Sequence, residues 1–157
     1  MRFPEKRGEA QPIGGKRSTR PDRITTRRPE MAEVMDKTQV IAGQNDLVRT
    51  ALADSQANRE AKEKGIRFQF VWTPGVNAKL LQTGKIAQLA TAIASFDGFT
   101  EDNDPYKQRD FFSTEVEGTK VFVKIDYYDR ELRGGSEDPT DPAQTVRVIT
   151  AMLPNEY

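Results

Sequence analysis

Two alternating runs of side chains on either side of Glu117-Gly118 constrain the fold more than any other feature of this sequence. Apolar residues or Thr occupy every second position in residues 112–116 and again in residues 121–127. A period of two puts such residues on one face of a β-strand. An acidic residue followed by Gly between two such runs is typical of a hairpin turn. The sequence therefore predicts a hairpin with strands over residues 111–117 and 120–128.

Another alternating run lies earlier in the chain, at residues 66–73. Four apolar side chains, from Ile66 to Trp72, alternate there with more polar ones, and three of the four are aromatic. Aromatic and β-branched residues are enriched in strands, and the following Pro74-Gly75 is a turn signal. We therefore expect a third strand over residues 66–73 with one buried face.

Helices are indicated by apolar residues at intervals of three and four. The predicted helices are residues 30–53, 84–96 and 142–153. Pro29 stands at a first helical position, where its missing N–H costs nothing, and Gly43 is a candidate break that would divide the first helix into two. The polar residues 54–65 end that first pattern. An Asp-Pro pair at Asp141 is a start signal for the last helix.

The predicted order is helix, strand, helix, strand, strand, helix, which defines an α+β fold. We expect a small three-stranded antiparallel sheet packed with two to four helices, with the helices at 84–96 and 142–153 on one face and residues 30–53 at an edge. The chain has 157 residues, a length typical of one domain. Only 36% of its residues are apolar, so part of the chain is expected to lie outside the core.

That part is expected at the start of the chain. Residues 1–28 are rich in Arg, Lys, Pro, Gly and Thr and poor in apolar residues, a composition typical of disorder. Residues 1–30 hold nine Lys/Arg against four Asp/Glu, and the remainder holds fifteen against twenty. The sequence predicts a disordered basic tail followed by a single domain over residues 29–157. The tail has two interpretations, contact with nucleic acid and a solubilising leader.

The chain has no cysteine and no histidine. Disulfides, thiolate nucleophiles, Cys/His zinc sites, Ser-His-Asp triads and haem ligation by His are therefore excluded within it. Catalysis would have to use carboxylates, Lys, Tyr, Ser or Thr, or a metal held by oxygen ligands. No apolar stretch approaches the ~20 residues of a membrane span, and no signal-peptide core follows Met1. We expect a cytoplasmic protein with no membrane partner, and we assign it no cofactor and no metal.

Acidic residues of the C-terminal third form one candidate site. Converging carboxylates can bind a hard cation or act in acid–base chemistry. The residues that could converge at one end of the hairpin are Asp102, Asp104, Asp110, Asp126 and Asp129. The spacing of the first two resembles the start of a calcium loop, but the Gly and the later Glu of such a loop are missing. Asp also forms turns and helix caps, and this structural interpretation stays open beside the functional one.

A second candidate lies on one face of the predicted strand 120–128. Alternation places Lys124, Asp126 and Tyr128 on the face opposite Tyr127. A face that mixes an aromatic ring, a cation and a carboxylate can bind a partner or a small ligand. It could equally be covered by the predicted C-terminal helix. The candidate ligand or partner surface therefore comprises Asp102, Asp104, Asp110, Lys124, Asp126 and Tyr128.

Four sequence segments resemble an uncharacterised bacterial family, domain of unknown function 3768. They are FDGFTEDNDPY at 96–106, RDF at 109–111, KIDYYD at 124–129 and GSEDPTDPAQTVRVITAMLPNEY at 135–157. Residues 41–46 and the helix leading to Phe96 are also similar, so the resemblance covers residues 37–157. Val123 stands where members carry Trp, Phe112 replaces a small residue, and Arg133 replaces an aromatic one. The resemblance implies a small protein encoded on bacterial chromosomes and plasmids, and it implies no established activity or catalytic residues.

The leading functional expectation is a non-enzymatic protein-interaction module whose partner is another protein. The acidic body and the absence of Cys and His favour it, and the resemblance adds an association with mobile elements. A counter-defence version would use carboxylates spaced like phosphates, and a regulatory version is the other form. One alternative is a small enzyme or ligand- or metal-binding domain that uses Asp104, Lys124, Asp126 and Tyr128. A second alternative is nucleic-acid contact through residues 1–28.

Overall fold

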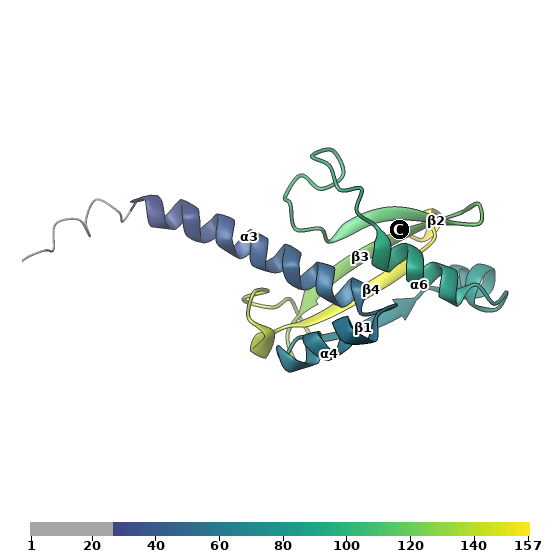
Figure 1. Ribbon diagram of the computed structural model, residues 1–157, viewed down its shortest axis with the longest axis horizontal. Helices are drawn as coiled ribbons and strands as arrows, with labels where there is room; N and C mark the ends of the chain where they lie inside the picture. Colours follow the sequence, from purple (N-terminus) through teal and green to yellow (C-terminus); the bar gives the residue numbers. More distant parts are fainter. Residues whose placement is uncertain (1–26) are drawn as a thin grey trace, which may run out of the picture. The chain divides into compact units, whose positions relative to one another are not determined.

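The structure, a computed structural model, describes the backbone of residues 27–157 and the side chains of residues 37–157 (Figure 1). The chain divides into two units, Met1–Asp36 and Lys37–Tyr157. All packing described below lies within Lys37–Tyr157. Residues 1–26 of the predicted basic tail lie outside the described residues, so the tail stays a prediction.

A four-stranded mixed sheet forms the centre of this unit. Its strands are β1 (Arg67–Trp72), β2 (Phe111–Val116), β3 (Thr119–Tyr128) and β4 (Val146–Met152). The spatial order is β1-β4-β3-β2. β4 runs parallel to β1 and antiparallel to β3, and β2 and β3 form the predicted antiparallel hairpin. Glu117 and Gly118 both have positive φ, at 47° and 86°, and positive φ at both central residues gives the turn whose twist matches the flanking strands.

The α+β class is confirmed, but the three-stranded antiparallel sheet and the final helix over residues 142–153 are wrong. The segment forms a three-residue 3-10 turn, Pro142–Gln144, followed by β4. Asp141 does act as a cap, because its Oδ1 accepts a hydrogen bond from the Ala143 N–H at 2.9 Å. β-Branched residues dominate the strand and favour it over a helix. The side chains of this central strand are buried on both faces, so they do not alternate between apolar and polar. Their apolar spacing therefore resembled that of a helix.

Helices α3 (Arg27–Thr50), α4 (Ser55–Glu63) and α6 (Ile86–Ser95) accompany the sheet, together with the short α5 (Pro74–Val76) and a π-helical turn over Asn77–Leu81. Gly43 does not interrupt α3. α4 occupies the polar residues that were expected only to end the first helix. Asp54 caps it by accepting from the Gln56 N–H, and Ala57 and Ala61 are its buried residues. None of the described helices is long and apolar enough to cross a membrane.

The hydrophobic core lies on one face of the sheet. Figure 1 shows α4, α6 and the part of α3 that follows Asp36 over the same side of the strands. The core packs strand residues against these helices, among them Phe112, Val121, Val123, Ile125, Ile149, Val48, Ala61, Leu89 and Ile93. Alternation then directs the neighbouring strand residues to the second face. That face is polar at its margins, with Arg67, Gln69 and Lys120 exposed.

The last residues of the chain are hydrogen-bonded to the turn after β1. Glu156 accepts hydrogen bonds from the backbone N–H groups of Gly75 and Leu153, each at 2.8 Å, and from the Thr73 hydroxyl. These bonds favour the ionised carboxylate and lower the pKa of Glu156. A Cβ at Gly75 would lie 2.6 Å from Leu153 Cδ1. A side chain at that position would have to displace the side chains of Leu153 and Glu156.

Candidate functional site

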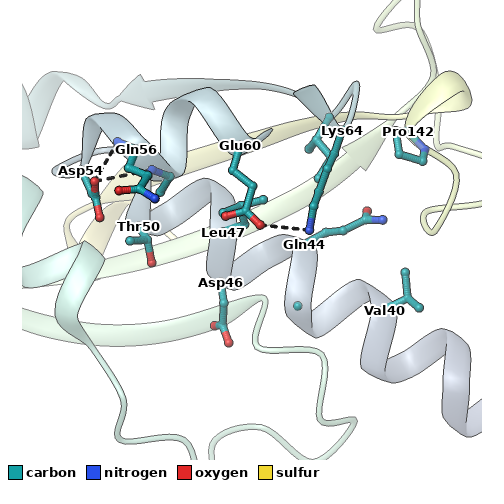
Figure 2. Close-up of a pocket in the computed structure, with 13 residues that line it drawn as sticks. Val40, Gln44, Asp46, Leu47, Thr50, Asp54, Gln56, Glu60, Lys64 and Pro142 are labelled. Atoms are coloured by element: carbon teal, nitrogen blue, oxygen red, sulfur yellow. Dashed lines mark hydrogen bonds and ion pairs between the residues drawn. The ribbon is translucent and has the colours of Figure 1, made fainter. Parts of the chain in front are cut away.

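A groove of about 670 Å³ lies between α3 and α4 (Figure 2). Its two walls come from consecutive helices, and Ile66 and Pro142 complete the lining. From α3 it takes Val40, Gly43, Gln44, Asp46, Leu47 and Thr50, and from the α4 side Asp54, Gln56, Ala57, Glu60 and Lys64. The lining thus combines apolar surface with a few polar groups, which is the usual make-up of a binding site.

The α3 wall is built on residues spaced by three and four positions. Val40, Gly43 and Leu47 share one side of the helix, and Val40 is 36% exposed. Gly43 is exposed, and a Cβ built on it would have no other atom within 4 Å. Glycine within a helix costs about 1 kcal/mol relative to alanine. No contact among the described residues requires glycine here.

Gln44 is only half satisfied. Its Nε2 donates to the carbonyl oxygen of Thr140 at 3.0 Å. That bond orients the amide, because the carbonyl can only accept. The buried Gln44 Oε1 has no hydrogen-bond partner among the described residues. The groove therefore has a buried acceptor beside Gly43 that lacks a donor.

The α4 wall carries the charges. Glu60 and Lys64 form an ion pair at 3.1 Å, with side chains 49% and 59% exposed, and Figure 2 shows both reaching into the space between the helices. An exposed pair one helical turn apart contributes only ~0.3–0.5 kcal/mol, so it can rearrange around an occupant. The carboxylates of Asp46, Asp54 and Glu60 outnumber the single cation, although Asp46 already pairs with Arg49 and Arg109.

The opposite side of α3 is anchored by a buried polar network. Asn45, fully buried, donates through Nδ2 to the Gln108 carbonyl and to the Tyr127 hydroxyl, both at 2.8 Å. Its Oδ1 accepts from Nε of Arg147 at 2.8 Å. Tyr127 in turn donates to Asp110 Oδ2 at 3.2 Å. One residue of α3 thus joins β3, β4 and the loop before β2.

Desolvation governs the electrostatics of this network. Arg147 is 0% exposed and donates through Nη2 to the Pro139 carbonyl, while Nη1 has no partner among the described residues. Burial lowers the pKa of Arg147 to about 10. Burial also raises the pKa of Tyr127 well above its usual value and raises that of Asp110. The Tyr127 ring lies 5.2 Å from the guanidinium carbon and stabilises the buried cation.

Arg49 holds the C-terminal end of α6. It is 5% exposed and donates through Nη1 to the carbonyl oxygens of Ile93 and Ala94, in the last turn of α6. A cation is favourable at that end of a helix dipole. The guanidinium carbon also lies 5.3 Å from the centre of the Phe99 ring. α3 is therefore held to both the sheet and α6 on the side away from the groove.

Three of the predicted acidic residues lie in turns or loops, and two of these accept hydrogen bonds from backbone groups nearby in the sequence. Asp104 is buried, and its Oδ1 accepts from the N–H groups of Gln108 and Arg109. Asp129 Oδ1 accepts from the N–H groups of Glu131 and Arg133. Asp102 is exposed in a turn. These placements match the turn-forming interpretation for Asp104 and Asp129.

The remaining predicted residues lie on two faces. Lys124 pairs with Asp126 at 3.3 Å, and alternation puts both, with Tyr128, on the face away from the helices. Asp110 instead points to Tyr127 on the helix-covered face. None of the six residues lines the groove. The structure thus brings Lys124, Asp126 and Tyr128 together, and Asp110 lies near enough to Asp104 and Asp126 for their charges to add to the rise of its pKa that burial causes. A binding role for the set stays a prediction.

Metal binding by a carboxylate cluster has no counterpart in the described part of the chain. No group of three Asp or Glu side chains there is arranged to hold an ion. The groove itself was not predicted, because α4 was not predicted. Two signals pointed to it: Gly43 inside a helical pattern, and Asp54 followed by Ala57 and Ala61 one turn apart, which is a capped helix with a narrow apolar stripe.

The structure is a small α+β domain with a groove between α3 and α4. Residues 72–156 match the model of the family described as Protein of unknown function (DUF3768). This is more than half of the chain, and the chain belongs to that family. Apart from Pro142, the groove residues precede the matched region. Comparison with curated proteins and comparison with solved structures each found no match.

Proposed function

We propose that this chain is a non-enzymatic protein-interaction module that binds an amphipathic helix of another protein in the groove between α3 and α4. Two packed helices present a trough whose walls run along both helix axes, and a third helix fits such a trough by placing its apolar residues at intervals of three and four. Val40, Leu47 and Ala57 supply the apolar contacts.

Gly43 is the observation that carries this proposal. It weakens α3 and has no contact that explains it. A side chain at this position would project into the groove, so its absence leaves room for the backbone of a docked helix to approach α3. Small residues have this effect wherever helices pack closely.

The polar groups of the groove specify the chemistry of the partner. The lining holds the carboxylates of Asp54 and Glu60 and one cation, Lys64. A partner helix with an apolar stripe and at least one Lys or Arg fits this lining, because the added cation balances the excess negative charge.

The test is capture from a bacterial lysate by the immobilised full-length chain, with the retained proteins quantified by mass spectrometry. Gly43→Leu fills the groove from a helix-compatible position. Ala87→Leu is the matched control, because it adds the same side chain to an exposed position of α6 outside the groove. We expect at least one protein to be retained by the wild type and by Ala87→Leu, and its retention to fall at least about tenfold with Gly43→Leu.

Retention of the same proteins by all three chains contradicts the proposal, as does the absence of any protein retained above the control resin. A retained protein counts in favour only if its purified form binds with the same order of affinities. Circular dichroism of Gly43→Leu checks that the variant folds.

The other functional hypotheses rest on other features. Mobile-element association, in a counter-defence or regulatory role, rests on the family resemblance. A ligand site at Asp104, Lys124, Asp126 and Tyr128 would have to recruit Asp104, whose Oδ1 already accepts hydrogen bonds from two backbone N–H groups of its own loop. Nucleic-acid contact through residues 1–28 concerns residues outside the described part. Each stays a prediction.

A further inference from the structure

The face of the sheet away from the helices carries an ordered pattern of apolar and charged side chains. Strand register places Tyr128 beside Val146, Asp126 beside Val148, Lys124 beside Thr150 and Phe122 beside Met152. Val71 of β1 extends this surface and is 39% exposed. Phe122 also contacts Phe111 and Tyr157, with ring centres 5.4 and 5.8 Å apart. The surface, here called the open face, runs across all four strands.

We infer that the open face binds a second copy of this chain, independently of the groove. Each cross-strand pair of β3 and β4 on the open face is called a row. A twofold axis that lies in the interface and crosses β3 at Ile125 would set each row of one copy against a row of the second copy. Closed dimers need such a self-complementary patch, because residue i meets residue j and residue j meets residue i.

The aromatic residues match under this operation. Tyr128 faces Phe122 of the second copy, and both side chains are only partly buried in the single chain. Val146 and Met152 lie beside them but are already buried, at 9% and 5% exposure, so they add little contact area. The Tyr128–Phe122 contact occurs twice by symmetry, so two aromatic contacts flank the axis.

The charges match as well. Lys124 faces Asp126 of the second copy, and Asp126 faces Lys124. The two side chains already pair at 3.3 Å within one chain, so the dimer joins two ion pairs into a network of alternating charge beside the axis. Networks contribute more than isolated surface pairs. A different registration, centred one row away on Lys124, would set Lys124 against itself, and like charges directly opposed are unfavourable.

An aromatic cluster lies exposed at one end of the open face. Tyr157 is 73% exposed while resting on Phe111 and Phe122. An aromatic cluster left on the surface marks an interaction site more often than a single exposed ring does.

The experiment is sedimentation equilibrium of the full-length chain over a concentration series up to about 300 µM, with a dimer constant of about 10 µM or tighter expected. Lys124→Glu places a carboxylate against Asp126 of the second copy and should weaken dimerisation at least about tenfold. The double variant Lys124→Glu with Asp126→Lys restores both pairings and should return to within about threefold of the wild type. Gly43→Leu, in the groove, should leave the constant unchanged.

A wild-type chain that stays monomeric over the series overturns the inference. So does a dimer that Lys124→Glu does not weaken, or one that the double charge reversal fails to rescue. A dimer abolished by Gly43→Leu would place the contact in the groove and also overturn it. Urea unfolding of each variant shows whether the monomer fold is intact, and the charge-reversed pair provides a folded comparison if the single variant is unstable.

Discussion

The two sides of α3 differ, although neighbouring residues form them. One side is buried against the sheet and α6, and the other borders the groove. Asn45, Val48 and Arg49 are buried against the sheet and α6, and Asn45 has a hydrogen-bond partner for each of its polar atoms. Gly43 and Gln44 border the groove, where one residue has no side chain and the other has an unpaired acceptor.

This difference separates residues that hold the fold from residues that are free to bind. A buried polar group is tolerated only when it is hydrogen-bonded, and Asn45 meets that condition three times over. Gln44 violates it with its buried Oε1, one position away on the same helix. A helix that is optimised on one side and left incomplete on the other is expected where stability and binding make different demands.

The largest expected effect is the loss of stability on changing Asn45→Ala. The substitution leaves the Gln108 carbonyl, Arg147 Nε and the Tyr127 hydroxyl without this partner, each in a desolvated region. We expect the free energy of unfolding in urea to fall by about 2–4 kcal/mol. Gln44→Ala is the matched comparison on the groove side, and we expect it to cost below about 1 kcal/mol because it removes one hydrogen bond and also removes the unpaired acceptor. Equal losses for the two variants would break the distinction between the two sides of α3.

A smaller effect of opposite sign is expected for Gly43→Ala. A methyl group at this position meets no atom within 4 Å, and alanine favours the helix. The midpoint of urea unfolding should rise, with a gain of about 0.5–1 kcal/mol. Destabilisation would mean that glycine is needed by the fold itself, and the argument for an occupant of the groove would lose its support.

The smallest effect is a change in pH dependence on Asp110→Asn. The pKa of Asp110 in the fold is raised above 3.8, chiefly by burial, so the native state binds this proton more tightly than the unfolded state. Ionisation of Asp110 therefore destabilises the fold as the pH rises through the folded-state pKa. We expect Asp110→Asn to stabilise the protein at neutral pH by less than Gly43→Ala does, and the gain to vanish as the pH falls toward 3.8. A gain that persists there would point to a cause other than this titration.

The elements predicted best from the sequence are those in which one face is buried and the other is exposed to solvent. The strand at 66–73 is β1, Arg67–Trp72, and the hairpin lies within one residue of its expected strands. The helix at 84–96 is α6, Ile86–Ser95. Each has a single apolar periodicity, which a one-dimensional pattern can reveal.

The elements missed have no clear periodicity. β4 is buried on both faces, so its apolar residues do not alternate and the Asp-Pro start signal favoured a helix. α4 has only alanines on its buried face, and nine mostly polar residues resembled a loop. The sheet order depends on β4, so the parallel β1–β4 pair could not be predicted either.

The site was harder to predict than the fold because its residues are far apart in sequence. Asn45 and Arg147 meet across 102 positions, and nothing local to Arg147 indicated a buried cation. The acidic residues drew attention through composition, yet several of them act within their own turns. Gly43 was noticed as a break in the pattern, and its significance depended on the position of α4.

The groove is tested most directly by methyl NMR of the full-length chain titrated with the purified protein that it retains. We expect shifts at Val40, Leu47 and Ala57, which line the groove, and little change at Val48, which is buried on the opposite side of α3. Gly43→Leu should abolish the shifts, and Ala87→Leu should preserve them. Shifts confined to Val71 on the open face, with the groove methyl groups unmoved, would contradict the assignment of the partner site to α3 and α4.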